Sequence, residues 1–144
     1  MPISTKTIIV EDNFDAVRNA VTGAMLMDAA MAGGNVVEGH AKVNASKGGT
    51  THLNVRTGHL VNAIATKEGK QEKTYAEAHI GPWDVVYARI HELGGIIKGA
   101  FGIPDMIVHM PARPYLRPAM DENEDDIETA VKTEIQRNLD KATK

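Results

Sequence analysis

A proline-rich stretch before the last helical segment constrains the fold of this chain more than any other feature. Residues 111–118 include Pro111, Pro114 and Pro118. Each proline fixes its own φ angle and biases the preceding residue away from the helical region. We therefore expect a stiff, extended arm up to Pro118, which suits the first turn of a helix. Two arginines and a tyrosine lie on this arm, an arrangement that favours docking on a partner over catalysis.

The length and composition are those of one domain. A chain of 144 residues buries roughly 68% of the surface of its unfolded state, so a single domain over residues 1–144 is expected. The chain has no cysteine, which excludes a disulfide framework and a thiolate zinc site and is compatible with a reducing cytoplasm. No signal peptide is evident, and no stretch has the ~18 apolar residues of a membrane span. These features predict a soluble protein made inside the cell, with no membrane partner.

The charge balance is mildly acidic and the aromatic content is low. The formal net charge is −3, so no global positive field would draw the chain onto DNA. Aromatic residues make up only 4% of the chain, which leaves few large side chains to fill a core. We expect a modestly stable subunit whose remaining apolar surface is covered by copies of itself or by partners.

The N-terminal part is expected to be mainly helical. A β-branched run at residues 5–10 predicts a short strand, after which Asp12 or Asn13 is a suitable helix cap. Apolar residues then recur at three- and four-residue steps across residues 14–40, as on the buried face of an amphipathic helix. The glycine pair at 33–34 lies inside this pattern and disfavours a regular helix. Two helices with a hinge and one long bent helix are both compatible with the pattern.

The middle of the chain predicts short elements. Thr57 is a candidate cap for one helical turn. Residues 63–81 alternate with period two around a turn at Gly69–Lys70, which predicts a β-hairpin. A further helix is expected over residues 82–93, ended by the left-handed conformation that Gly94–Gly95 allows.

The C-terminal part combines an irregular segment with a helix. Residues 96–112 are rich in glycine, proline and β-branched residues, so they form either a hairpin or a long loop, and a loop of that length is usually functional. Residues 118–142 are expected to be helical, and the acidic run at 121–128 either complements the helix dipole or docks a basic partner. The predicted fold class is α+β. It comprises a small antiparallel sheet packed by a long N-terminal helix and a C-terminal helix, with a long loop or hairpin excursion.

No motif of an enzyme or a metal site is complete. His91–Glu92 resembles the start of a zinc-protease motif, but the second histidine that the motif needs is replaced by Gly95. The six histidines, at positions 40, 52, 59, 79, 91 and 109, show no paired metal spacing. The chain also lacks a phosphate-binding loop and a nucleophile elbow. We therefore expect a protein without catalytic activity, metal or cofactor. A hydrolase that uses His91 and Glu92 is the enzymatic alternative.

Three arginines on the arm and on the preceding helix are candidate binding residues. They are Arg89, Arg113 and Arg117. One interpretation is that they pair with Glu92, Asp121 or Glu122 and hold the last helix in place. Another is that they face a second subunit, since arginine and tyrosine are favoured interface anchors. In a third, they join Lys98 in contacting DNA phosphates inside a channel.

Three motifs in a fixed order resemble those of a known family. They are Thr57–Ile64, Tyr87–Gly94 and Pro111–Ala119. The corresponding family pattern is Thr-Gly-x-Leu-x-x-Ser-Ile, then Tyr-Ala-x-x-x-Glu-Phe-Gly, then Pro-Ala-x-Pro-Phe-Leu-x-Pro-Ala before a terminal helix. The ordered set resembles the neck or tail-completion proteins of long-tailed bacteriophages, the lambdoid head-tail joining tail components, over residues 12–142.

The departures from the family pattern are mild. This chain has Ala63 where the pattern has serine, and Leu93 and Tyr115 where it has phenylalanine. No one of the three motifs is specific by itself, and the resemblance rests on their order and spacing.

The resemblance implies a structural component of the virion at the head-tail junction, made in the host cytoplasm. Such a protein has no catalytic activity and assembles as a homo-oligomeric ring, sixfold like a tail tube or twelvefold like a portal. Its partners are a tail terminator or tail-tube protein on one side and a head connector or adaptor protein on the other. A nucleic-acid-contacting channel protein without catalytic activity, which would touch DNA, is the alternative.

The predicted interface combines the arm, the preceding helix and the excursion. The excursion at residues 96–110 is expected to reach an adjacent subunit or ring, becoming ordered on assembly. The interface residues are Tyr87, Arg89, Glu92, Ile97, Phe101, Ile103, Arg113, Pro114, Tyr115, Leu116 and Arg117.

Overall fold

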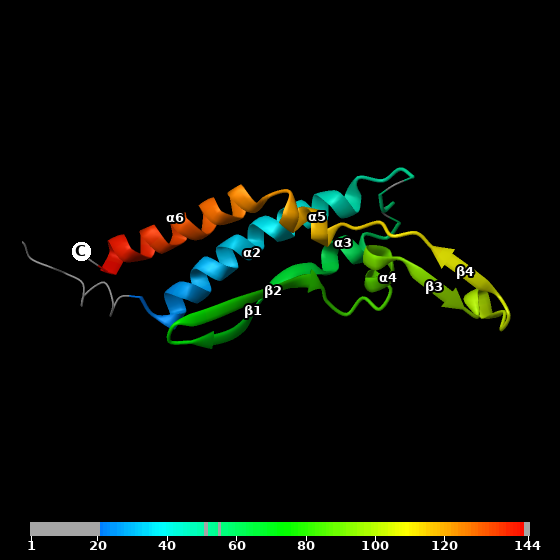
Figure 1. The fold of residues 1–144 in the computed structure, drawn as a ribbon, viewed down its shortest axis with the longest axis horizontal. Coiled ribbons are helices and arrows are strands. Elements are labelled where there is room, and N and C mark those ends of the chain that lie inside the picture. Colours follow the sequence, from blue (N-terminus) through cyan, green and yellow to red (C-terminus); the bar gives the residue numbers. More distant parts are fainter. Residues whose placement is uncertain (1–20, 51, 55, 143–144) are drawn as a thin grey trace, which may run out of the picture.

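The computed structural model describes residues 21–50, 52–54 and 56–142 and has the predicted α+β fold (Figure 1). The elements in chain order are α2 (Gly23–Ser46), α3 (His59–Ala63), β1 (Ile64–Glu72), β2 (Tyr75–Pro82), α4 (Ala88–Leu93), β3 (Gly95–Lys98), the 3-10 helix η1 (Ala100–Gly102), β4 (Ile107–Met110), α5 (Leu116–Asp121) and α6 (Glu124–Ala142). The predicted strand at 5–10 and the predicted helix start at Asp12 or Asn13 lie outside the described residues.

Helix α2 is a single continuous element that runs through its glycine pair. Thr22 caps its first turn. The glycines allow two neighbours to approach the helix closely. A Cβ on Gly33 would lie 2.9 Å from Cγ2 of Val131, and a Cβ on Gly34 would lie 2.5 Å from Cγ2 of Thr66. The structure therefore favours one long helix over two with a hinge, because close packing offsets the low helix propensity of glycine.

The short helix α3 and the hairpin β1–β2 follow as predicted, except for the position of the turn. The Oγ1 atom of Thr57 accepts a hydrogen bond from the amide of His59 at the start of α3. The chain reverses at residues 73–74, whereas the predicted turn at 69–70 falls in a bulge of β1. A Cβ on residue 69 would lie 2.5 Å from the ring of His79. A glycine is thus needed here for close packing across the strands. Glycine also favours turns, so the sequence alone does not distinguish the two causes.

The predicted helix over residues 82–93 is confirmed in its second half and wrong in its first. Only α4 is helical, and the residues before it form turns in which Asp84 has a φ of +60°. The predicted glycine stop is confirmed, since Gly94 follows α4 with a φ of +70°.

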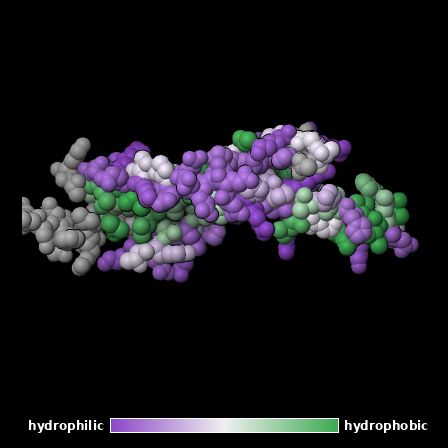
Figure 2. Space-filling view, turned by 45° about the horizontal axis from the view of Figure 1, so that its top comes forward, coloured by the Kyte–Doolittle hydropathy of each residue, from purple (hydrophilic) through white to green (hydrophobic). Residues whose placement is uncertain are grey.

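The segment after α4 forms a hairpin rather than a loop. Strands β3 and β4 pair antiparallel, from Gly95 opposite Met110 to Lys98 opposite Ile107. They contact mainly each other and lie at the end of the molecule farthest from the C-terminal end of α6 (Figure 1). Figure 2 shows hydrophobic residues gathered at this end.

The C-terminal helical region is divided into α5 and α6, where one helix is predicted from residue 118 onward. The division lies at Glu122–Asn123, where the side chain of Asn123 donates to the carbonyl of Ala119 at 3.0 Å. This side-chain bond competes with regular helix geometry. Of the acidic run predicted to complement a helix dipole, Glu124, Asp125 and Asp126 lie in the first turn of α6, and Lys141 lies in its last turn.

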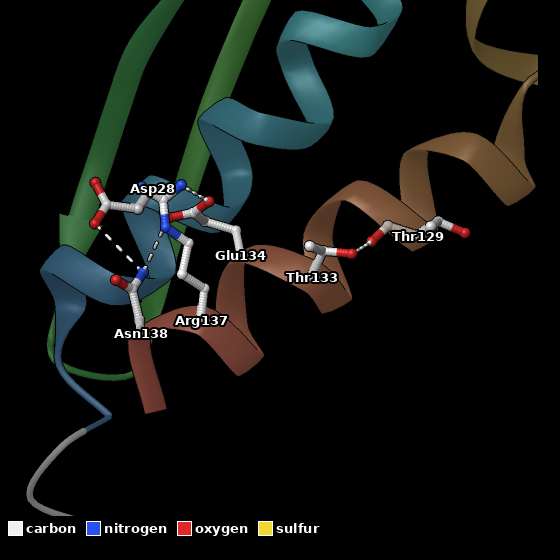
Figure 3. A network of polar contacts seen from close by, with 6 residues as sticks. All are labelled: Asp28, Thr129, Thr133, Glu134, Arg137 and Asn138. Carbon is white, nitrogen blue, oxygen red and sulfur yellow. Dashed lines mark hydrogen bonds and ion pairs between the residues drawn. The ribbon is translucent and has the colours of Figure 1, made fainter. Parts of the chain in front are cut away.

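Helix α2 lies between α6 and the β1–β2 hairpin (Figure 1). Ile127 and Val131 of α6 are half-buried toward α2. Near the other end of α6, Nδ2 of Asn138 donates to Asp28 on α2 and to Glu134 on its own helix, each at 3.5 Å (Figure 3). The apolar stripe that the sequence predicts for the last helix therefore packs against α2.

The core lies where α2, α5 and β1 meet the loop after α2. It consists of Val37, Ala41, Ala45, Leu53, Ile64, Tyr115 and Ala119. Most of these side chains are small, as the composition predicts, so the ring of Tyr115 is the largest that is fully buried. Nδ2 of Asn44 donates to the backbone carbonyl of Tyr115 at 3.2 Å inside this core. The core therefore attaches the arm directly to α2.

Candidate functional site

The motifs before and after the excursion meet at the side chain of Glu92. Its Oε2 accepts hydrogen bonds from the amides of Tyr115 at 2.8 Å and Leu116 at 3.0 Å, and its Oε1 accepts from the amide of Arg117 at 2.9 Å. The amides of a first helical turn have no partner within their own helix. A carboxylate placed there satisfies them and interacts favourably with the helix dipole. Glu92, at the end of α4, thus caps α5, although the whole β3–β4 hairpin separates the two helices in the sequence.

Two backbone features reinforce this junction. The amide of Arg113 donates to the carbonyl of His91 at 2.7 Å. A Cβ on Gly94 would lie 2.8 Å from the amide nitrogen of Ala112 and 2.9 Å from the carbonyl oxygen of Met110. Only glycine fits there, so α4 and the arm are held together on both sides of the hairpin base.

The interpretation that the arginines are held by ion pairs is wrong for the described residues. Within that part of the chain, no ion pair joins Arg89, Arg113 or Arg117 to an acidic side chain. The carboxylate of Glu92 binds backbone amides instead. Arg89 and Arg117 are exposed, whereas Arg113 is half-buried.

The predicted anchor Tyr115 is a core residue. Its side chain is 2% exposed, so it does not extend from the arm toward another subunit as predicted. Burial, and to a smaller extent the nearby Glu92, raises the pKa of Tyr115 to about 12. Of the other predicted arm residues, Pro114 is exposed and Leu116 is half-buried. The extended arm turns its ring inward because the apolar surface of α2 lies beside it.

A cavity of about 600 Å³ lies beside this junction. Its lining comes from the C-terminal end of α2, the loop after it, α3, α4 and the arm. The lining residues are Ala45, Leu53, Asn54, Arg56, Thr57, Gly58, His59, Leu60, Val61, Tyr87, His91 and Arg113. None of these residues is acidic, and Arg56 and Arg113 are cationic. The cavity therefore combines apolar walls with positive charge.

Two polar atoms buried at this cavity have no hydrogen-bond partner among the described residues. They are Nδ1 of His91 and Nε of Arg113. Burial and the neighbouring charge of Arg113 lower the pKa of His91. The ring of Tyr87, 43% exposed, meets the His91 ring edge-on at 5.6 Å between centroids. Arg56 and Arg113 both line the cavity, so their positive charges make it suited to an anionic group.

The hairpin exposes large apolar side chains. The exposed fractions are 56% for Ile96, 86% for Phe101, 54% for Ile103 and 58% for Ile107, at the end of the molecule where Figure 2 shows hydrophobic residues. Phe101 has a φ of +56°, a conformation that is uncommon and strained for a bulky residue. Ile97, also predicted at the interface, is half-buried.

Sequence reasoning missed several residues of these two surfaces. Ile96 lies opposite His109 and Ile107 lies opposite Lys98 in the paired strands. The apolar residues at 96–97 and 106–108 are adjacent in the sequence, so no period-two alternation distinguished the exposed face. Arg56 and His59 flank the glycine of the first motif. Only folding brings them beside His91, and no local pattern indicates that contact.

The described residues show no arrangement typical of a metal site or a membrane span. Within those ranges, no group of three or more histidine, cysteine, aspartate or glutamate residues is placed to hold a metal ion. No helix among them is long and apolar enough to cross a membrane. Comparison of the chain with protein-family models, with curated proteins and with solved structures found no match.

Proposed function

We propose that this chain is a non-catalytic structural protein that assembles through its β3–β4 hairpin into a homo-oligomeric ring. By its sequence resemblance, the ring belongs to the head-tail junction of a long-tailed phage virion. The observation that carries the assembly is the projecting hairpin with its exposed apolar side chains. The location in the virion rests on the ordered motifs alone.

A two-stranded hairpin without a covering layer is marginally stable in water. Strands β3 and β4 pair over four residues each, and their contacts are mainly with each other. Contiguous exposed apolar patches on soluble proteins usually mark interaction surfaces. A neighbouring chain that covers Ile96, Phe101 and Ile107 would remove their apolar surface from water, at roughly 25 cal/mol for each Å².

The base of the hairpin supports this role. Glu92 and Gly94 hold α4 against the arm, so the hairpin leaves the body from a fixed junction. The hairpin is at one end of the molecule (Figure 1), and a contact between this end and a different surface of the next copy is heterologous. Heterologous contacts form a closed ring when the rotation between copies suits a whole number of them. In the proposed virion, the ring would join a tail terminator or tail-tube protein to a head connector.

The proposal is tested by the mass of the purified chain in solution, measured alone and with assembled tails. We expect a ring, or a monomer that binds tail ends stoichiometrically. Phe101→Asp is expected to abolish both behaviours without changing the circular dichroism spectrum. Val43→Asp is the matched control, because Val43 is 58% exposed but lies on α2.

Two results would contradict the proposal. One is a stable monomer that binds neither tails nor heads. The other is salt-dependent DNA binding that needs Arg89, Arg117 and Lys98, which would favour the channel alternative.

A further inference from the structure

The tip of the hairpin carries one acidic group on an apolar surface. Phe101 and Ile103 are exposed there, and the exposed Asp105 follows them after one proline. Asp105 is the only acidic residue between Gly95 and Met110. No hydrogen bond or ion pair joins its carboxylate to any other described residue. The tip therefore presents an apolar surface with the unpaired carboxylate of Asp105, and the exposed Lys98 lies beside it at the end of β3.

The cavity beside the junction has the complementary character. Leu53, Leu60 and Val61 form apolar walls, and Arg56 and Arg113 contribute positive charge. A carboxylate is a strong acceptor for a guanidinium N–H. The cavity volume of about 600 Å³ lies within the range of pockets that enclose a drug-sized ligand.

We infer that this cavity receives the hairpin tip of a second copy of the chain, with the carboxylate of Asp105 facing the guanidinium groups of Arg113 and Arg56. Phe101 and Ile103 of the inserted tip lie against the apolar walls. The inference rests on the proposed function, because it names the surface that the hairpin uses. A chain does not fill its own cavity, since its tip is exposed at the end of the molecule (Figure 1).

A protein tip fits this cavity better than a DNA phosphate does. The walls are largely apolar, and a phosphate backbone needs a row of exposed cations rather than an apolar hollow. The contact joins two different surfaces, so it continues from copy to copy and is compatible with a closed ring.

The test uses two single charge reversals, Asp105→Lys and Arg113→Glu, studied separately and mixed. Each variant alone places like charges in every tip-cavity contact, so its association constant is expected to fall about a hundredfold or more. In an equimolar mixture, each tip meets a cavity of opposite charge, so alternating assembly is expected to return. Sedimentation velocity measures both states. Lys47→Glu is the control, since Lys47 is an exposed residue at the end of α2 that does not line the cavity.

If thermal denaturation shows that Arg113→Glu disturbs folding, a second pair of variants replaces the first. Arg56 is exposed and lines the cavity, so Arg56→Glu mixed with Asp105→Lys should restore association in the same way. Arg113→Gln is expected to weaken association by about tenfold.

The outcomes separate this inference from the proposed function. Loss of association in Phe101→Asp, combined with full association of the Asp105 and Arg113 variants, would overturn the cavity contact and leave the proposed assembly in place. A wild-type chain that stays monomeric at every concentration would also overturn the contact, and binding to tails would then decide the proposed function. Salt-dependent DNA binding that is lost in Arg113→Gln would replace the tip by a phosphate as the occupant.

Discussion

The body of the molecule and its hairpin differ in what covers their apolar side chains. In the body, α2 lies between α6 and the β1–β2 hairpin, and residues such as Ile64 and Tyr115 are almost fully buried. In the β3–β4 hairpin, Ile96, Phe101 and Ile107 remain more than half exposed. The body thus has a buried core like that of an independently folded unit. The hairpin has apolar residues typical of a core, but they are exposed to solvent. This difference is the basis for proposing the hairpin as the surface that another chain covers.

The junction at Glu92 connects these two regions. The carboxylate caps α5 from α4, so the arm belongs to the body although the sequence separates it from α4 by the hairpin. Changes in the body or in the junction should therefore alter folding, whereas changes at the hairpin should alter assembly.

The largest effect is expected from Tyr115→Ala. Removing this buried ring should lower the free energy of unfolding by about 3–5 kcal/mol, because it leaves a cavity in a core of small side chains. Urea denaturation followed by circular dichroism measures the change. Tyr87→Ala is the control, since the Tyr87 ring is 43% exposed and its loss should cost about 1 kcal/mol or less. Equal losses in the two variants would contradict the assignment of Tyr115 to the core.

Next in size is Glu92→Ala. Three amides lose a charged acceptor, so we expect the free energy of unfolding to fall by about 2–3 kcal/mol. Hydrogen exchange at the amides of Tyr115, Leu116 and Arg117 should accelerate in the same variant. Glu122→Ala, at an exposed carboxylate after α5, should leave these amides protected. Unchanged exchange in Glu92→Ala would show that the arm does not depend on α4.

Replacing one glycine at the junction and one at the hairpin tip compares how tightly the two sites are packed. Gly94→Ala should cost about 2–3 kcal/mol, because it combines a strained backbone with contacts to backbone atoms. Gly102→Ala has a similar φ of +76° but no atom within 4 Å of its new Cβ, so only strain of about 1 kcal/mol is expected. Thermal denaturation measures both, and equal costs would remove the distinction between a packed base and an open tip.

Phe101→Gly should leave folding almost unchanged. Relief of the left-handed strain and the greater chain entropy of glycine oppose each other, so the unfolding free energy should shift by about 0.5 kcal/mol or less. Association should weaken clearly, because the most exposed aromatic ring of the tip is gone. Calorimetry measures the unfolding free energy and sedimentation measures association, both on the same sample. A large loss of stability would show that Phe101 belongs to the folded body.

The smallest effect is expected from the pH dependence of His91. Burial and Arg113 lower its pKa in the folded state, so the unfolded chain binds the proton more readily. Stability should therefore fall as the pH drops through the ordinary histidine range near about 6.5. His91→Gln should remove this part of the slope in unfolding experiments between pH 7.5 and 5.5. An unchanged slope in the variant would assign the pH dependence to other groups.

Much of the local structure was predictable from sequence. The apolar stripe of α6, the β1–β2 hairpin and the stop at Gly94 follow from periodicity and from glycine conformation. An error and an open alternative arose where one pattern has two physical causes. The predicted turn at Gly69 was wrong, because this glycine is needed to pass the His79 ring. The choice between a hinge and one long helix at Gly33 was left open, and helix packing decides it.

The candidate sites were less predictable than the elements. Phe101 and Ile103 were identified from the unusual composition of their segment, and both are exposed. The role of Glu92 as a cap for α5, the inward position of Tyr115 and the cavity around Arg113 all depend on contacts between distant segments.

By itself the sequence determined the element types, the fold class and the stiffness of the proline arm, because these depend on neighbours within a few positions along the chain. Only the tertiary structure decided which arm residue enters the core, which amides Glu92 binds and which apolar residues stay exposed. Those outcomes depend on surfaces that meet only after the chain has folded, since burial and hydrogen bonding are properties of the assembled packing rather than of any local pattern.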